Sequence, residues 1–131
     1  YRYVSDVEML AHEVDVLVLC VPGSAATRGL IGRAAIEALG PEGVLINVAR
    51  GSVVDQDALV AALADGRLGG AGLDVFADEP RVPDALLAME TVVLQPHLGS
   101  ATIETRRAMA QLVIDNVLAY ANGRPLLTPV G

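Results

Sequence analysis

Arg50, Glu79 and His97 are three side chains suited to ligand binding and proton transfer, and each follows soon after a run of apolar residues. A guanidinium group always carries its charge and pairs with a carboxylate through two parallel hydrogen bonds. An imidazole exchanges protons near neutral pH, and a neighbouring carboxylate orients it and favours its charged form. Together these residue types predict a site that anchors an anionic ligand and moves a proton.

The three residues share one location if the apolar runs are strands of one sheet. The runs span residues 14–21, 44–48, 70–75 and 91–94, and helix-like stretches lie at 30–39, 55–65 and 102–122. This alternation predicts an α/β fold with a doubly wound parallel sheet, Rossmann-like, and Asp55 is a good N-cap for the second helix. All four carboxyl ends then lie along one edge, where open α/β sheets bind their ligands.

Taken singly, each of these residues also has an ordinary explanation. Arg50 could be a surface arginine after a strand, and Glu79, beside Asp78 in a polar loop, could be solvated charge. His97 could make a hydrogen bond within its own loop. Only the shared sheet edge makes the three together a candidate catalytic site.

Composition and charge exclude several classes of function. The 131 residues fit one domain, and 9 basic against 16 acidic residues give a net charge of −7, which argues against a nucleic-acid partner. Cys20 is the only cysteine, so neither a disulfide nor a Cys-based metal site is expected, and its apolar neighbours predict a small core residue. No run approaches the ~18 apolar residues of a membrane helix, and no signal peptide is visible. We therefore expect a cytoplasmic protein with no membrane partner and no metal.

Three segments, in order, resemble the D-isomer-specific 2-hydroxyacid dehydrogenases. The family's arginine signature is matched by NVARGSVVD at residues 47–55, its glutamate segment by DVFADEP at 74–80, and its histidine segment by PHLGSA at 96–101. Order and spacing agree as well, and the likeness covers nearly the whole chain. Within this family the chain is most similar to the glyoxylate/hydroxypyruvate reductases.

This resemblance implies an oxidoreductase that transfers a hydride between NAD or NADP and a small 2-oxo acid/2-hydroxy acid pair. Arg50 would anchor the carboxylate of the substrate and polarise its ketone as negative charge develops. His97 would donate the proton, and Glu79 would orient the imidazole. The nicotinamide would bring the hydride, while the protein supplies placement and electrostatics.

Cofactor contacts also carry over from the resemblance. They fall on Val21, Pro22, Thr27, Val48, Ala49, Arg50, Asp74, His97, Leu98, Gly99 and Ser100. Among them, Asp74 resembles the aspartate that accepts a hydrogen bond from the carboxamide. Family members usually have a bulkier Leu or His and then Thr-Pro after the first proline, whereas this chain has GSA at 23–25.

One feature of dinucleotide-binding domains is absent from the sequence. No Gly-x-Gly-x-x-Gly turn follows a strand, and in the resembled family this turn precedes the segment that matches residue 1. We therefore expect residues 1–122 to be the C-terminal part of an NAD(P)-binding domain, and residues 123–131 to be a tail returning toward a substrate domain absent from this chain. The isolated chain should be inactive, and the longer enzyme a homodimer through its cofactor domain.

Two alternatives remain open at this point. Dinucleotide-sensing proteins, such as corepressors that resemble these dehydrogenases, keep the same fold and the same three residues. A catalytically dead fragment that serves only in assembly is the other alternative. Changing His97 to Ala separates them, because an enzyme should lose reduction while retaining cofactor binding, whereas a sensor should keep its partner.

Overall fold

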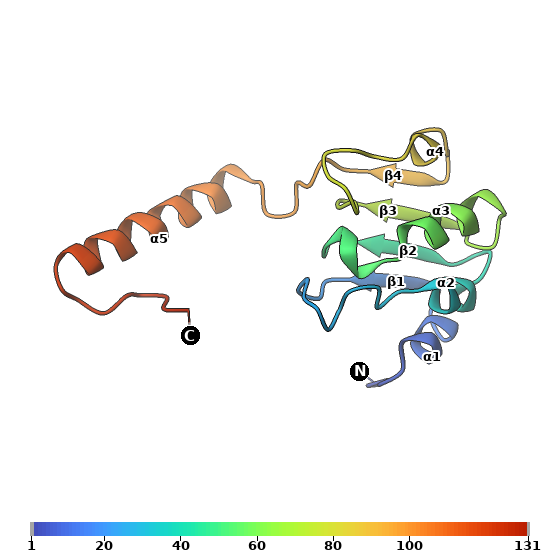
Figure 1. Cartoon of the computed structure of the whole chain (residues 1–131), viewed down its shortest axis with the longest axis horizontal. Helices are drawn as coiled ribbons and strands as arrows, with labels where there is room; N and C mark the ends of the chain where they lie inside the picture. The colour runs from blue at the N-terminus through green and yellow to red at the C-terminus, as the bar shows by residue number, and fades with distance from the viewer. Residues whose placement is uncertain (1, 131) are drawn as a thin grey trace. The chain divides into compact units, whose positions relative to one another are not determined.

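The computed structural model describes residues 2–130 of the chain, and its four strands form one parallel sheet in the order β1-β2-β3-β4. The strands are β1 (Val16–Leu19), β2 (Val44–Asn47), β3 (Gly70–Leu73) and β4 (Val92–Leu94). All four arrows point the same way, so their carboxyl ends share one edge (Figure 1). The predicted α/β class and parallel sheet are confirmed, although each strand is shorter than its apolar run.

Within residues 2–130, five α-helices and one 3₁₀ turn precede, connect or follow the strands. They are α1 (Val7–His12), α2 (Arg33–Leu39), η1 (Gly51–Val53), α3 (Gln56–Ala64), α4 (Asp84–Leu87) and α5 (Ile103–Ala121). Asp55 caps α3 as predicted, because its carboxylate accepts the N–H of Ala58 at 3.0 Å. The helix predicted at residues 30–39 begins later, at Arg33, since Ile31 is extended and its N–H donates to Val53 O at 3.0 Å.

One face of the sheet carries the core. Leu17, Leu45 and Ala71 are neighbours in register across three strands, and each is buried. They belong to the same apolar cluster as Ile36 of α2 and Leu59 of α3, and both helices lie over this face (Figure 1). Successive strands are always added on the same side, so right-handed crossovers place their helices on one face.

The opposite face of the sheet is exposed at its two outer strands, β1 and β4. Val16 and Val18 of β1 are 50% and 54% exposed, and Val93 of β4 is 64% exposed. Cys20 lies two residues after Val18, on the same side of the chain, and is exposed too. The prediction that Cys20 is a core residue is therefore wrong. The apolar run around Cys20 is buried on one side only, and alternation along a strand then leaves every second residue outside.

The sheet ladder continues past the strands into the loops that follow them. The backbone N–H groups of Val48, Asp74 and Gln95 each donate to a neighbouring strand, at 3.2, 3.0 and 2.8 Å. These bonds fix the direction in which each loop leaves the carboxyl edge. The residues that come next, among them Arg50 and His97, therefore start from a rigid frame.

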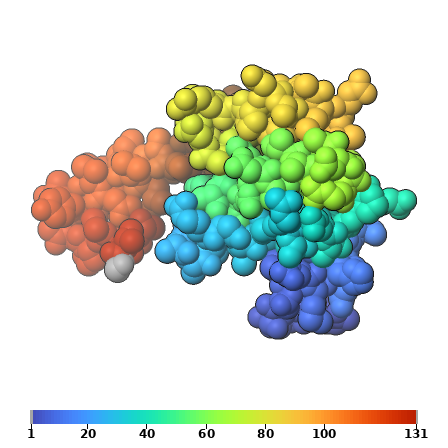
Figure 2. Space-filling view, turned by 45° about the vertical axis from the view of Figure 1, so that its right-hand side comes forward, coloured from blue at the N-terminus to red at the C-terminus, as the bar shows by residue number. Residues whose placement is uncertain are grey.

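The chain forms two compact units, residues 1–97 and 98–131. In the first unit, α1 and the α4–β4 segment lie at opposite ends (Figures 1 and 2). In the second, Asn116 of α5 holds the following tail, because its amide oxygen accepts the N–H of Leu127 at 3.0 Å. The predicted domain boundary after residue 122 concerns the longer protein and stays a prediction. None of the helices within residues 2–130 has the length and apolar character of a membrane-spanning segment.

The cap of α3 gives a prediction about stability. Changing Asp55 to Ala removes the acceptor for the Ala58 N–H, and we expect the free energy of unfolding to fall by about 1 kcal/mol in denaturant titration. Changing Asp55 to Asn keeps an acceptor oxygen and should lower the free energy of unfolding by at most about 0.3 kcal/mol. Equal losses in the two variants would show that the cap bond does not stabilise α3.

Candidate active site

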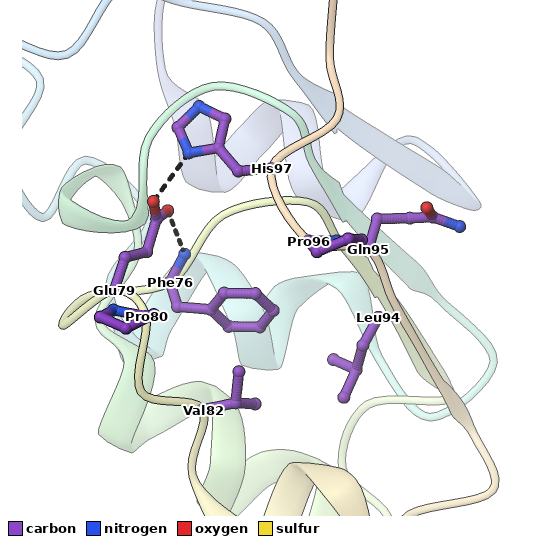
Figure 3. Close-up of a pocket in the computed structure, with 8 residues that line it drawn as sticks. All are labelled: Phe76, Glu79, Pro80, Val82, Leu94, Gln95, Pro96 and His97. Carbon is purple, nitrogen blue, oxygen red and sulfur yellow. Dashed lines mark hydrogen bonds and ion pairs between the residues drawn. The ribbon is translucent and has the colours of Figure 1, made fainter. Parts of the chain in front are cut away.

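Glu79 and His97 form a directly bonded pair at the carboxyl edge of the sheet. Oε2 of Glu79 lies 2.7 Å from Nδ1 of His97, and Oε1 of Glu79 accepts the backbone N–H of Phe76 at 3.0 Å (Figure 3). Both carboxylate oxygens thus have a partner, which fixes the plane of the carboxylate. The other ring nitrogen of His97 points away from Glu79 (Figure 3).

The hydrogen bond from His97, and next the N–H of Phe76, hold the pKa of Glu79 below its ordinary value. The charge of Arg50 adds in the same direction. An ionised carboxylate only accepts hydrogen bonds, so Nδ1 of His97 carries the proton between them. Nε2 is then the ring nitrogen left available for a hydrogen bond with a ligand.

The backbone of His97 has an uncommon conformation. Its φ is +53°, the only positive value at a non-glycine position within residues 2–130. The left-handed region costs an L-residue with a Cβ about 1 kcal/mol or more, and such residues cluster at functional sites. The strained backbone conformation therefore occurs at His97, the residue whose ring binds Glu79.

Asn47 supports the arginine segment from the buried end of β2. Its side chain is 2% exposed, its carbonyl oxygen accepts the N–H of Ala49 at 3.0 Å, and its amide donates to the backbone oxygen of Arg50 at 3.1 Å. A buried amide with both ends satisfied holds the backbone rigidly. Asn47 therefore sets the turn that presents Arg50.

The arginine and glutamate segments meet backbone to backbone at Gly51. A Cβ placed on Gly51 would lie 1.9 Å from the carbonyl oxygen of Phe76, far inside any allowed contact. Only glycine fits there. Gly51 follows Arg50 directly, and Phe76 binds Glu79, so this contact brings the guanidinium segment and the Glu79–His97 pair to the same part of the edge.

Arg50 lines an open cavity of about 460 Å³ at the ends of β1 and β2. The cavity is lined by Cys20, Val21, Pro22, Gly23, Val48, Ala49 and Arg50. Five of these seven are predicted cofactor contacts, and Cys20 and Gly23 are additions. The Nη1 of Arg50 donates to the backbone oxygen of Ala49 at 2.6 Å.

Gly23 is in close contact with the side chain of Arg50. A Cβ at Gly23 would lie 2.7 Å from Cγ of Arg50, so any side chain at this position would push the arginine away. The loop itself is closed by Thr27, whose hydroxyl donates to Pro22 O at 2.8 Å and accepts the N–H of Ser24 at 2.9 Å. Thr27 thus shapes the loop and does not line the cavity.

The remaining predicted cofactor residues divide between the two units. Asp74 is 6% exposed at the end of β3, where its N–H donates to Asn47 O at 3.0 Å. Leu98, Gly99 and Ser100 belong to the second unit, so their part in the site stays a prediction. Within residues 2–130, no group of three His, Cys, Asp or Glu side chains is arranged to hold a metal ion.

A second cavity, of about 310 Å³, lies beside the Glu79–His97 pair (Figure 3). Its walls are formed by Phe76, Glu79, Pro80, Val82, Leu94, Gln95, Pro96 and His97. Most of this lining is apolar, and the ring of Phe76 extends into it (Figure 3). The cavity lies beside the pair and does not bury it, because the side chains of His97 and Glu79 are 45% and 35% exposed.

Sequence reasoning assigned no role to Asn47, Gly23 or Gly51. Asn47 carries a readable signal, since a polar residue inside an otherwise apolar strand needs buried partners. The two glycines give no such signal, because their role depends on which backbone or side chain approaches them in space.

Comparison with known proteins shows strong similarity along the whole chain. Residues 1–99 match the family described as D-isomer specific 2-hydroxyacid dehydrogenase, NAD binding domain. A hydroxyphenylpyruvate reductase of Plectranthus scutellarioides is 55% identical over 130 residues, which cover 99% of this chain and 42% of that protein. A glyoxylate/hydroxypyruvate reductase of Arabidopsis thaliana is 52% identical over 130 residues, which again cover 99% of this chain and 42% of that protein.

Solved structures give the same result. The NADPH-dependent glyoxylate/hydroxypyruvate reductase of Sinorhizobium meliloti, in complex with NADP and malonate, is 49% identical with a TM-score of 0.96. The match covers 100% of this chain and 41% of that one. The chain therefore spans about two fifths of the length of the relatives that it matches.

The lowered pKa of Glu79 predicts how stability depends on pH. The folded state favours the carboxylate, so its contribution is fully present above the ordinary value of 4.5 and is lost as pH falls through the lower folded-state pKa. We expect the Glu79→Gln variant to lack this part of the pH dependence in denaturant titrations from neutral to acid pH.

Glu90→Gln is the matched control for that titration, because it changes an exposed carboxyl of the same unit. It should follow the wild-type protein at every pH. If Glu79→Gln also follows the wild type, the pair with His97 does not favour the ionised carboxyl.

Proposed function

Because the chain belongs to the D-isomer specific 2-hydroxyacid dehydrogenase family, within its NAD binding domain, we propose that the whole protein is an NAD(P)-dependent reductase of small 2-oxo acids. The observation that carries this proposal is the Glu79–His97 pair at 2.7 Å, joined through Phe76 and Gly51 to the segment of Arg50. The arrangement would supply a proton and a cation at the same edge of the sheet.

The cavity beside Arg50 fits the cofactor that this function needs. It is open, about 460 Å³ in volume, and lies at the carboxyl edge of the sheet, where its lining is partly apolar and partly polar and includes Arg50. Val21, Pro22, Val48 and Ala49 would hold the bound dinucleotide. When bound, the reduced nicotinamide supplies the hydride that reduces the ketone.

The chain's own residues divide the remaining work. Arg50 binds the carboxylate of the 2-oxo acid and lowers the energy of the negative charge that develops on the ketone oxygen. His97 gives its Nε2 proton to that oxygen as the carbonyl carbon receives the hydride, so the product is the neutral hydroxyl of a 2-hydroxy acid. Glu79 holds the imidazole in position and stabilises it while it is charged.

Residues 1–122 are proposed to be the C-terminal part of the cofactor domain and residues 123–131 a tail toward a substrate domain. The proposal includes a cytoplasmic homodimer that has no nucleic-acid partner. A net charge of −7 supports the last point, and the exposed apolar residues of α5, such as Val113 at 64% and Val117 at 61%, support self-association. Light scattering of the full-length protein tests the dimer.

The function is tested with the His97→Ala variant of the full-length protein. Removing the proton donor should lower kcat for reduction of glyoxylate or hydroxypyruvate by at least about 100-fold, while the Kd of NADPH or NADH stays within twofold. The oxidation of reduced cofactor gives kcat, and fluorescence titration gives Kd. An unchanged kcat would rule out His97 as the donor, and a wild-type protein inactive on a panel of 2-oxo acids would favour a dinucleotide-sensing role.

Arg50 gives an independent prediction about substrate binding. Arg50→Lys keeps the positive charge but loses the second of two parallel hydrogen bonds, so KM for the 2-oxo acid should rise about tenfold or more. Arg33→Lys, on the exposed side of α2, is the matched control and should leave KM unchanged. Equal KM values for Arg50→Lys and the wild type would show that Arg50 does not bind the carboxylate.

A further inference from the structure

We propose that Gln56 is a positioning residue that holds the loop carrying Glu79 and thereby keeps the Glu79–His97 pair aligned with Arg50. This inference rests on the proposed function and extends it to a side chain that touches neither cofactor nor substrate in the mechanism above. It starts from one contact. Oε1 of Gln56 accepts the backbone N–H of Ala77 at 3.0 Å, across 21 positions of sequence.

The contact acts on the loop immediately beside Glu79. Ala77 follows Phe76, whose own N–H donates to Oε1 of Glu79 at 3.0 Å. Two successive N–H groups of the loop are therefore each held by a side-chain oxygen, one from within the loop and one from α3. The first bond, from the Val75–Phe76 peptide, orients the carboxylate of Glu79, and the second fixes the adjoining Phe76–Ala77 peptide.

The loop has few other restraints at this point. Residues 77–81 are all exposed, and the backbone bond within them joins the N–H of Arg81 to the oxygen of Asp78 at 2.8 Å. An exposed loop with few buried contacts opens easily. A bond from a distant, ordered element therefore contributes much of the order that this segment has.

Gln56 can act as such an anchor because its own backbone is fixed. It is the first residue of α3, directly after the capping residue Asp55, whose N–H donates to Ile31 O at 2.9 Å. The first turn of α3 is packed into the core through Leu59, which is 2% exposed. Gln56 also stands on the connection that begins at Arg50, so it links the two segments of the site a second time, beyond the contact at Gly51.

The kinetic consequence is specific. Loss of the Gln56 bond lets the Phe76–Ala77 peptide turn and so shifts the adjoining N–H of Phe76, which binds Glu79. The hold of Glu79 on His97 then weakens, while the side chain of Arg50 stays in place. The rate of proton transfer should fall, while the binding of substrate and cofactor should stay the same. We expect Gln56→Ala in the full-length protein to lower kcat about three- to tenfold, with KM for the 2-oxo acid and Kd for the cofactor within twofold of wild type.

Two variants serve as controls. Gln56→Glu keeps an oxygen that accepts the Ala77 N–H and should retain kcat within about twofold. Asp57→Ala changes the next, exposed residue of the same helical turn and should have no effect on kcat. If Gln56→Glu loses as much as Gln56→Ala, or if Asp57→Ala does so too, the bond to Ala77 is not the cause and the inference fails.

A double-mutant cycle tests whether Gln56 acts through Glu79. In a Glu79→Gln background, the further change Gln56→Ala should alter kcat by less than about twofold, because the interaction that it supports is already gone. The same fold loss in both backgrounds would overturn the inference.

Hydrogen exchange of the Ala77 amide separates failure of this inference from failure of the proposed function. The amide should exchange faster in Gln56→Ala than in the wild type and in Asp57→Ala. If the wild-type protein reduces no 2-oxo acid, the proposed function fails, and the exchange rate still tests the hold of Gln56 on the loop. An unchanged rate overturns the inference whether or not the protein is active.

Discussion

The site depends on a close approach between two stretches of backbone, Gly51 against the carbonyl of Phe76, where a methyl group would stand 1.9 Å from the oxygen. Everything that the proposed reaction needs is arranged about this contact. On one side Asn47 holds the turn that presents Arg50. On the other side Phe76 binds Glu79, which binds His97. Arg50 and His97, which follow separate strands, are therefore brought to the same part of the sheet edge.

The electrostatics of the site follow from this arrangement. Glu79 has a hydrogen-bond partner on each oxygen, and these partners lower its pKa, so the ionised carboxylate is favoured beside the ring of His97. The strained backbone of His97, with φ at +53°, shows that the fold places the ring against a local conformational preference. Glycine would satisfy that backbone but would bring no imidazole.

The sequence allowed the fold class and the candidate catalytic residues to be predicted because both follow local patterns. Apolar runs and turn residues predicted the four strands, and Asp55 before an apolar face predicted the cap of α3. Cys20 was placed wrongly because a continuous apolar run does not say whether one or both faces of a strand are covered. The roles of Gly51 and Gln56 depend on contacts with residues more than 20 positions away, which no local pattern contains.

The strand order has a consequence for how the chain reaches this structure. Each strand pairs with the one made just before it, so every pairing closes a single crossover and no strand waits for a remote segment. The entropy of closing a loop rises only slowly with its length, and the rate of folding falls as contacts become more distant in sequence. A sheet of this order can grow one strand at a time from the N-terminal side, in the direction in which a ribosome releases the chain. The edge that carries the candidate site is then completed last, when β4 docks and brings His97 to Glu79.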